Sequence, residues 1–589
     1  MTSPHLLVIA LGPVQDFIFQ ARRSRDLWFG SHLLSELSRA AARSLAGDGD
    51  LVFPSLAEEE LKPCDGPTRP GGQPPVTVVN KIIAEIPPNK DPAVCARRAR
   101  EAVRNEWDAI AARVKRCRLK DQLLPPDIDA VWKEQVDDIL EFYATWVPLG
   151  DDYNAARAAA EQVLAGRKNL RDFRAWKVHR PGAPKSSLDG ARVSVLRKGN
   201  ERADYGAYRR FRITEGEQLD AIGVIKRTGF DPEQFIPLAN IAAADWLRRA
   251  EVNAKEQLAD VRMACSDRGI PRVERDLPAV AAFQYDASVL YPSRWAPLFE
   301  ELHKVDNAAT ARAWGECHIR PLLKQMKEPP AYVACLVADG DHMGAAISKL
   351  ETAQDNRDFS AALAKFPTAA RCIVEQTHRG GLIFAGGDDV LAFLPVATAC
   401  ACAAELAGTF HHIMEAAAPA GAVPTLSVGI AIGHMLESMS VLLAVGRQAE
   451  RAAKDAGRNA LAVIIDKRSG GRRQFGLCWI TQPVERLRHD AELLATSLST
   501  GKVHELEALL RRFPDPHKYH VPDPASVGAA LVAYAADILA HTGDGTATTS
   551  LCQLGIHAPQ PDYTSFRKTL QDTINRLLVV REMRAAGFA

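Results

Sequence analysis

Two short apolar runs, residues 382–384 and 390–394, flank the glycine pair Gly386-Gly387 and the acidic pair Asp388-Asp389. Apolar runs of this length that are bounded by glycine predict β-strands. Glycine accepts the backbone angles that a tight hairpin turn needs. The segment therefore predicts an antiparallel hairpin with two adjacent carboxylates at its turn.

The hairpin lies inside a regular order of predicted elements. In chain order these are a strand at 332–338, a helix at about 359–376, the two hairpin strands, a helix at 397–416, a strand at 425–432, a helix at 439–456 and a strand at 460–465. The order β-α-β-β-α-β is typical of a ferredoxin-like domain. Here it carries one more helix and one more strand.

The rest of the chain is mostly helical in pattern. Two further strands are predicted at 6–11 and 76–86, whereas helical patterns cover about 14–45, 91–173 and 241–330, and everything from about residue 484. A chain of 589 residues is long enough for about four domains. The predicted fold class is α+β.

Composition and charge exclude several classes. The 73 basic and 72 acidic side chains nearly cancel, so any RNA-binding surface must be local or supplied by partners. No apolar run is as long as a membrane span, and the N-terminus lacks a secretory signal. The eleven cysteines form no C-x-x-C pair, which indicates reduced thiols in the cytoplasm and no structural zinc.

The acidic residues around the hairpin suggest a metal site. Asp339 ends the strand at 332–338, and in a ferredoxin-like sheet that strand lies beside the hairpin. Asp339, Asp388 and Asp389 could then share Mg²⁺ or Mn²⁺, which prefer oxygen ligands. A solvated Gly-Gly-Asp turn without a ligand is the alternative.

Other residues are candidates for binding a nucleotide. Gly386 and Gly387 allow a phosphate to approach the backbone, and Lys454 lies in the last turn of a helix, within reach of a phosphate. The alternative for Lys454 is a charge that complements the helix dipole. Gly340 and Asp341 complete the set, although Asp341, like His342, can also serve as a helix cap or loop residue.

Four segments in this order resemble the palm of GGDEF diguanylate cyclases. They are ADGDHMG (338–344), FAGGDDVLAFLP (384–395), TLSVGIAIG (425–433) and AERAAKDAGRNA (449–460). GGDD in place of GGDEF resembles, more narrowly, the second palm of the large polymerase/cyclase subunit of type III CRISPR effector complexes.

The N-terminal half resembles the first palm and the following region of that subunit in the type III-B group. The matching segments are GPVQDFI (12–18), ARRSRDLW (21–28), FP (53–54), NK (80–81), GEQLDAIGVIKR (216–227) and FQYD (283–286). The resemblance implies two ferredoxin-like palms with a helical insert and a C-terminal helical domain. The expected domains are an inactive first palm at 1–150, a helical middle domain at 151–330, the GGDD palm at 331–480 and a helical domain at 481–589.

The sequence departs from the family pattern in two places. Relatives commonly carry an HD nuclease domain before the first palm, whereas here the first strand begins by residue 6, so we expect no HD-type DNase. The dipeptide His489-Asp490 is predicted to be a surface pair. Ser186 and Asp189 stand where many relatives have zinc-binding cysteines, so no zinc is expected.

The resemblance implies an ATP-using nucleotidyltransferase that makes cyclic oligoadenylates once target RNA is bound. Asp339, Asp388 and Asp389, with the carbonyl of Gly340, would hold two metal ions, and Lys454 would stabilise the triphosphate. The first palm has Leu11-Gly12-Pro13 in place of the acids and should bind nucleotide without metal. The expected partners are the other effector subunits, the guide crRNA, target RNA and ATP, with no membrane.

Two alternatives stay open. An adenylyl group could be transferred to a small acceptor such as S-adenosylmethionine, or the chain could be a non-catalytic scaffold of the guide-RNA complex. The resemblance also implies that the C-terminal region contacts a small helical subunit. Deletion of residues 484–589 is therefore expected to weaken assembly more than it changes the palm fold.

Overall fold

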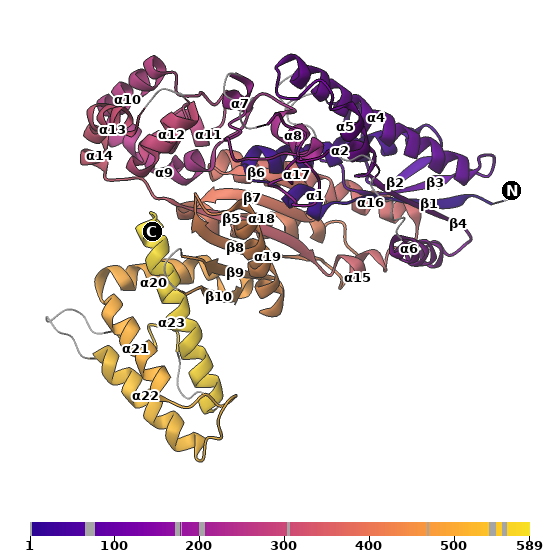
Figure 1. The fold of residues 1–589 in the computed structure, drawn as a ribbon. Helices are drawn as coiled ribbons and strands as arrows, with labels where there is room; N and C mark the ends of the chain where they lie inside the picture. Colours follow the sequence, from indigo (N-terminus) through magenta and orange to yellow (C-terminus); the bar gives the residue numbers. More distant parts are fainter. Residues whose placement is uncertain are drawn as a thin grey trace.

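The structure is a computed structural model that describes residues 3–64, 77–170, 177, 180–198, 206–302, 307–467, 471–540, 549–556 and 562–588. Two β-sheets, of four and six strands, are each covered by helices. In Figure 1 the four-stranded sheet lies at the right, the six-stranded sheet at the centre and the C-terminal helices below. The predicted α+β fold class is confirmed.

The four-stranded sheet has the topology of a ferredoxin-like domain. The N-terminal elements are β1 (His5–Gly12), α1 (Gln15–Phe19), α2 (Ser24–Ala46), β2 (Asp50–Phe53), α3 (Glu58–Leu61), β3 (Lys81–Ile86), α4 (Pro92–Lys120), α5 (Asp129–Asp137), β4 (Glu141–Pro148) and α6 (Tyr153–Asn169). The strand order is β2-β3-β1-β4, and every neighbouring pair is antiparallel. We call this sheet, with α2 and α4, the first palm.

The six-stranded sheet repeats this topology and extends it. Its elements are β5 (Tyr332–Asp341), α15 (Met343–Ile347), α16 (Ala353–Leu363), α17 (Lys365–Arg371), a π-helical turn (Cys372–Thr377), β6 (Gly381–Gly386), β7 (Asp389–Pro395), α18 (Val396–Glu415), β8 (Thr425–His434), α19 (Met439–Asp455), β9 (Ala460–Ile465) and β10 (Arg473–Cys478). The order β10-β9-β8-β5-β7-β6 contains the ferredoxin-like order β8-β5-β7-β6. The added β9 is parallel to β8. We call this unit the second palm.

Helices make up most of the middle and C-terminal regions. The middle helices are α7 (Gly206–Arg210), α8 (Ala221–Thr228), α9 (Leu238–Asn253), α10 (Lys255–Arg268), α11 (Pro278–Ala281), α12 (Trp295–Leu302), α13 (Ala308–His318) and α14 (Arg320–Met326), with short 3₁₀ turns at Pro232–Gln234, Ala287–Leu290 and Pro292–Arg294. After a 3₁₀ turn at Trp479–Thr481, the C-terminal helices are α20 (Pro483–Thr496), α21 (Thr500–Arg512), α22 (Pro524–Ala540) and α23 (Tyr563–Ala585).

The two palms share one hydrophobic core. Apolar side chains of the first palm, such as Leu33 and Leu34 on α2, belong to the same buried cluster as Phe393 and Leu442 of the second palm. α2 contacts β6 directly, and α1 contacts α19. Because burial of apolar surface is the main stabilising term in folding, this common core joins the two palms into one unit.

Three strands were not predicted. β4 falls in a segment with a helical prediction, which is wrong there: β4 is an edge strand with mostly half-buried side chains, so it lacks a continuous apolar run. β2 has only four residues, and β10 buries only Phe475. Weak burial removes the period-2 signal on which strand prediction depends.

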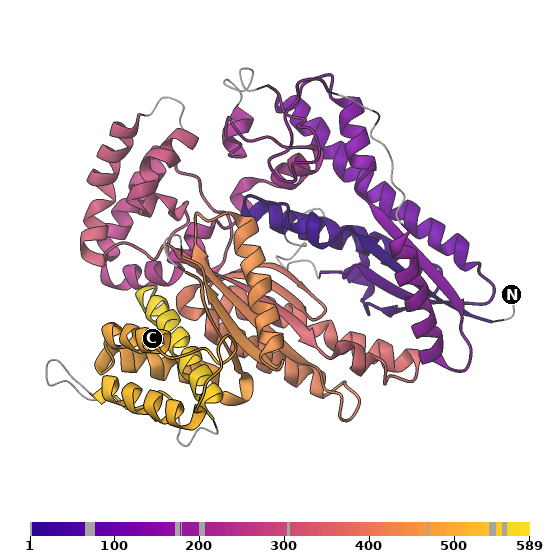
Figure 2. The ribbon, with the colours of Figure 1, turned by 60° about the horizontal axis from the view of Figure 1, so that its bottom comes forward.

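The C-terminal helices are divided between two cores. Val484, Leu487, Val579 and Val580, from α20 and α23, are buried in the core of the second palm, and a separate cluster joins α21, α22 and α23. Figures 1 and 2 agree that these helices lie beyond the second palm, away from the first sheet. Deletion of residues 484–589 would remove these side chains from the core of the second palm, so a truncated chain does not separate an effect on assembly from an effect on the palm fold.

In the described part of the chain, no helix is both long and apolar enough to cross a bilayer.

Candidate active site

The hairpin predicted from the sequence is present. Gly386 pairs with Asp389 across β6 and β7, so Gly387 and Asp388 form a two-residue loop. Gly387 has a φ of +64°, which residues with a side chain rarely adopt. A positive φ at the first loop residue is typical of a type II′ turn. Asp388 therefore lies in the loop, and Asp389 begins β7.

β5 brings a third carboxylate to the hairpin. It pairs with β7 so that Ala338 is opposite Val390, and Asp339 comes directly after this pair. The next residue, Gly340, passes so close to the turn that a β-carbon on it would lie 2.5 Å from Asp388 Oδ2. The Gly340 backbone lowers the pKa of Asp388 slightly, against the stronger effects that raise it. Residues far apart in the sequence thus meet as predicted.

The pKa values of the two hairpin carboxylates, Asp388 and Asp389, are raised. Burial, and then the charge of Asp339, raises the pKa of Asp388 to about 6. Burial also raises the pKa of Asp389, with further contributions from a hydrogen bond to Asp339 and from the charge of Asp388. Clustered carboxylates with raised pKa values are typical of sites that bind a cation.

The carboxylates at the hairpin fit Mg²⁺ or Mn²⁺ that is held jointly with substrate phosphates. Among the described residues, no group of three or more His, Cys, Asp or Glu side chains is arranged to hold a metal ion by itself. Mg²⁺, however, is usually bound by one or two carboxylates together with substrate phosphates. Asp388 and Asp389 at the hairpin, and Asp339 beside it, match that requirement.

Lys454 contacts one of the acids directly. It lies in the last turn of α19, where its Nζ contacts Asp339 Oδ2 and is 2.7 Å from Glu450 Oε1. Burial opposes its charge, but the hydrogen bonds with Asp339 and Glu450 outweigh burial and raise the pKa of Lys454. The ammonium is therefore charged at neutral pH. Glu450 was not predicted, although its i,i+4 spacing from Lys454 was a usable signal.

Asp341 has internal partners. It is buried, and its carboxylate accepts hydrogen bonds from Ser427 Oγ at 2.9 Å, Thr425 Oγ1 at 3.0 Å and the backbone amide of Asn459 at 2.9 Å. It is not among the residues that line the cavity at the acids. Its assignment to nucleotide binding stays a prediction, and its contacts tie β5 to β8. His342 is the N-cap residue of α15, as one alternative predicted.

The acids open into a cavity of about 460 Å³ between the palms. The second palm contributes Asp339, Asp388, Asp389, Glu450 and Lys454, together with Gly386, Gly387, Arg447 and Arg451. The described residues that line the first-palm wall include no Asp or Glu. The cavity thus has one acidic wall with a lysine and one uncharged to basic wall.

The first-palm wall is rich in small polar side chains that sequence reasoning missed. Ser31, Ser35 and Ser38 lie along one face of α2, and Asn80 and Lys81 lie at the start of β3. Ser38 is buried, and its Oγ has no hydrogen-bond partner among the described residues. The i, i+4, i+7 spacing of serines on an otherwise apolar helix was the available signal.

Ser186 and Asp189, which stand where many relatives have zinc-binding cysteines, both have other partners in the structure. Ser186 is buried, with its Oγ 3.4 Å from Asp220 Oδ1, while Asp189 forms an ion pair with Arg192 at 3.0 Å.

The prediction of a surface pair at His489-Asp490 is wrong for the aspartate. Asp490 is fully buried and accepts a hydrogen bond of 2.5 Å from Arg576 Nε, which connects α20 to α23. His489 is exposed and donates to the backbone carbonyl of Gln553.

Two protein families match parts of the chain. Residues 332–462 match the family described as Cas10/Cmr2, second palm domain. Residues 6–112 match the family described as CRISPR-associated protein Cmr2, N-terminal. The first match runs from β5 to the start of β9 and includes all three acids and Lys454, and the second runs from β1 into α4.

Known proteins extend the likeness over nearly the whole chain. The "CRISPR system Cmr subunit Cmr2" of Pyrococcus furiosus is 25% identical over 564 residues, and the match covers 80% of this chain but only 62% of the relative. Structures of the type III-B Cmr-beta complex, bound to cognate target RNA and in the apo state, share the fold: TM-scores are 0.66 and 0.65 at 12% identity. The two alignments cover 99% of this chain and, respectively, 83% and 82% of the matched chains. Two segments of the chain are thus similar to Cas10/Cmr2 domains, its sequence is similar to a Cmr2 subunit, and the chain shares the fold of the type III-B Cmr-beta structures.

Proposed function

We propose that this protein is the large subunit of an RNA-guided type III CRISPR complex and that its second palm converts ATP to cyclic oligoadenylates. One observation carries the proposal: Asp339, Asp388 and Asp389 converge beside Lys454 on one wall of a cavity whose other wall is the first palm. A nucleotidyltransferase that joins two nucleotides needs space for both on either side of one metal-binding edge.

The second palm would hold the nucleotide that is attacked. Mg²⁺ or Mn²⁺ held by Asp339, Asp388, Asp389 and the carbonyl of Gly340 would neutralise triphosphate charge and activate a 3′-hydroxyl. Lys454 would orient the triphosphate with its charged ammonium. Gly386 and Gly387 leave space for a phosphate to approach the backbone.

The first palm would hold the nucleotide whose 3′-hydroxyl attacks. Its wall offers the hydroxyls of Ser31 and Ser35 and the amide of Asn80, together with Lys81, whose ammonium is 2.6 Å from Glu161 Oε1. These groups can donate hydrogen bonds to a base, a ribose or a phosphate. Because this wall supplies no carboxylate among its described residues, the reaction would depend on the acids of the second palm alone.

The partners are proposed from the relatives. The Pyrococcus furiosus relative is described as a Cmr subunit, and one structure with the same fold belongs to a complex bound to target RNA. We infer that this chain assembles with other type III subunits and a guide crRNA, and that target RNA activates it. A bistable arrangement of the palms would suffice, since misplacing reacting atoms by about 1 Å can cost roughly a hundredfold in rate.

The test is product analysis by mass spectrometry in the reconstituted complex with ATP and Mn²⁺. We expect cyclic oligoadenylates with matched target RNA, and little product without target or with target that also pairs with the 5′ tag of the guide. The variant Asp388→Asn with Asp389→Asn should form none. An adenylylated small acceptor such as S-adenosylmethionine would indicate the alternative reaction, and unchanged ATP in every sample would indicate a scaffold. Equal rates with and without target would contradict activation by RNA.

A further inference from the structure

A second, larger cavity lies away from the acids. It measures about 780 Å³ and is bounded by the junction of α1 and α2, by the segments around α7 and α12, and by residues 435–439 at the start of α19. Eight of its lining residues are arginines and five are carboxylates. In a chain whose net charge is only +1, this is a strong local excess of positive charge. We call it the arginine cavity.

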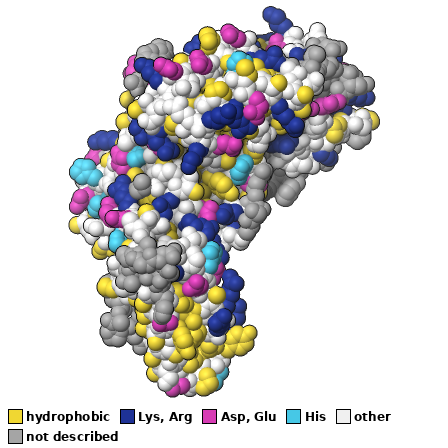
Figure 3. All heavy atoms as spheres, turned by 90° about the vertical axis from the view of Figure 1, so that its left-hand side faces the viewer, with side chains coloured by type: hydrophobic (Ala, Val, Ile, Leu, Met, Phe, Trp, Pro, Cys, Tyr) yellow, Lys and Arg dark blue, Asp and Glu magenta, His cyan; other side chains and the backbone are white. Residues whose placement is uncertain are grey.

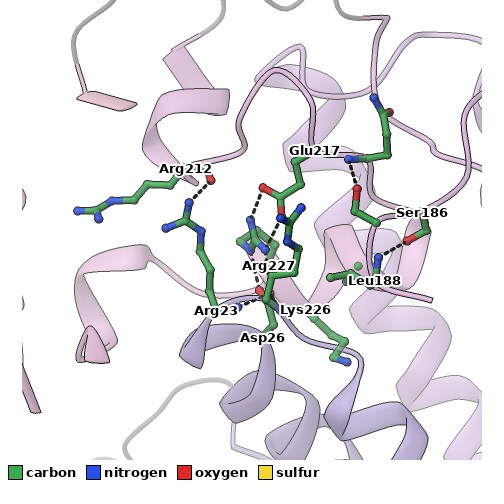
Figure 4. A network of polar contacts seen from close by, with 12 residues as sticks. Arg23, Asp26, Ser186, Leu188, Arg212, Glu217, Lys226 and Arg227 are labelled. Carbon is green, nitrogen blue, oxygen red and sulfur yellow. Dashed lines mark hydrogen bonds and ion pairs between the residues drawn. The ribbon is translucent and has the colours of Figure 1, made fainter. Parts of the chain in front are cut away.

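Three of the five carboxylates that line the cavity, those of Glu217, Asp286 and Glu301, already form ion pairs with arginines. Glu217 and Asp26 hold the buried Arg227, at 2.9 Å and 2.6 Å, as Figure 4 shows. Asp286 forms an ion pair with Arg212, and Glu301 lies 3.5 Å from Arg294. Glu233 and Glu437 also line the cavity, so its eight arginines still exceed its five carboxylates.

Arg25 is a buried cation without a partner. Its side chain is 7% exposed, and its Nη1 makes no hydrogen bond to any described residue. No described carboxylate forms an ion pair with it. Burial, and then the charge of Arg227, lowers the pKa of Arg25 to about 9. An unpaired buried charge is destabilising, and its retention indicates a ligand of opposite charge.

Arg23 lies on the same segment and is half-buried. Its Nη2 donates to the backbone carbonyl of Arg212 at 2.9 Å (Figure 4), and its nearest carboxylate, on Glu301, is 3.9 Å away. Burial and the charge of Arg227 lower the pKa of Arg23 to about 10. At the rim, Arg22, Arg209 and Arg272 are exposed. Buried Arg25 and half-buried Arg23 thus both keep a pKa above neutral pH, and the rim adds further arginines beside them.

We propose that the arginine cavity binds phosphate groups, carried either by a single-stranded RNA or by a free nucleotide. The planar guanidinium matches the oxygens of a phosphate in bidentate geometry. The volume of the cavity is in the range of small-molecule and cofactor sites. Arg23 and Arg25 would form the deep contacts, and Arg22, Arg209 and Arg272 would contact neighbouring phosphates at the rim.

The position of the cavity connects it to the acids. α2 lines the arginine cavity with Ser24 and Arg25 and, about 15 Å further along its axis, lines the first cavity with Ser35. α19 likewise begins in the arginine cavity at Met439 and ends at Lys454. A phosphate bound between the starts of these two helices would therefore act on both walls of the cavity that holds the acids.

Binding can be measured independently of catalysis. The probes are a labelled single-stranded RNA of ten nucleotides, followed by fluorescence anisotropy, and tripolyphosphate, followed by calorimetry, both in EDTA. The variants are Arg25→Gln and Arg209→Ala, and the matched control is Arg116→Ala, an exposed arginine on α4 outside the cavity. We expect a loss of affinity of about tenfold in each cavity variant and none in the control. For RNA, each lost arginine should also reduce the slope of log K against log salt by about 0.7.

The two probes distinguish the sources of phosphate. Loss of RNA affinity alone assigns the cavity to a strand, and loss of tripolyphosphate affinity alone assigns it to a free nucleotide; either result supports the proposal. Wild-type affinity for both probes in both variants would overturn it. Arg25→Gln should unfold no earlier than wild type, because it removes an unpaired buried cation; if it fails to fold, the exposed Arg209→Ala decides. The variant Asp388→Asn with Asp389→Asn should bind both probes normally, so failure of the proposed reaction would leave this result unaffected.

Discussion

The α-carbon of Gly340 lies against the carboxylate of Asp388, so that a β-carbon on Gly340 would come within 2.5 Å of Asp388 Oδ2 and 2.7 Å of its Cβ. A methyl group at position 340 must displace the aspartate at the hairpin turn. The contact makes the two residues interdependent, although they belong to different strands.

Gly340→Ala should reduce nucleotide transfer about a hundredfold while the protein stays folded, because a shift of about 1 Å in a catalytic group has an effect of that order. The matched control is Gly344→Ala, since nothing lies within 4 Å of a β-carbon at that position. Initial rates of product formation and thermal melting of both variants test this. Equal rates in the two variants would show that the position of Asp388 does not limit the reaction.

The raised pKa values of Asp388 and Asp389 predict a pH-dependent stability in the metal-free protein. Because the folded-state pKa of Asp388 is about 6 against an ordinary value of 3.8, the protonated form is favoured in the folded state. The stability that protonated Asp388 contributes to the folded state is present below pH 4 and is lost as the pH rises through 6. For Asp388 the full pKa shift would correspond to a loss of about 3 kcal/mol in the free energy of unfolding. Because the side chain is partly exposed to solvent, the actual loss is smaller.

The variant Asp388→Asn with Asp389→Asn should therefore melt at a higher temperature than wild type at pH 7 in EDTA, and at nearly the same temperature at pH 4. Addition of Mn²⁺ at pH 7 should stabilise wild type but not the variant. A difference between the two proteins that does not change with pH would contradict the assigned pKa directions.

Lys454→Gln should lower the turnover number about a hundredfold, since removal of one preorganised donor typically has that effect. It also frees Asp339 from its lysine contact. Lys454→Arg should restore part of the rate because it keeps the charge. Lys168→Gln on the exposed surface of α6 is the control. A drop in ATP affinity with unchanged turnover would instead assign Lys454 to ground-state binding.

α22 presents an apolar face that the rest of the described chain does not cover. Ala529, Ala533 and Ala536 are exposed, and Tyr534 is 58% exposed. Figure 3 shows hydrophobic side chains gathered over the lower, C-terminal part of the molecule. If this face binds another subunit, Ala533→Glu should weaken co-purification with the complex without changing the melting temperature, whereas Ala112→Glu on α4 should not. This substitution is a better test than deletion of residues 484–589, because the deletion would remove buried side chains from the core of the second palm.

The parts of the fold that were predicted are those with strong local signals. Buried strands such as β5 and β8 are continuous apolar runs, and the Gly-Gly-Asp-Asp turn has only a few compatible conformations, so the second palm and its acids followed from the sequence. β4 is an edge strand with half-buried side chains, and its sequence carries no comparable signal.

The parts of the site that were missed depend on tertiary contacts. Ser31 and Asn80 line the cavity only because the first palm packs on the second. Asp341 differs from Asp339 by two positions, but only the structure shows that its carboxylate is taken up by Ser427 and Thr425. The sequence motifs identified candidate acidic and basic residues, whereas tertiary packing determines which of them face the cavity.

The shared core of the two palms has a consequence for how the site comes into being. An enzyme assembled from two identical halves loses its site on dilution, because the halves separate. Here both walls of the cavity belong to one polypeptide and are joined by buried side chains such as Leu34 and Phe393. Formation of the cavity is an intramolecular event. The fraction of molecules with an intact cavity is therefore independent of how many copies of the protein a cell contains.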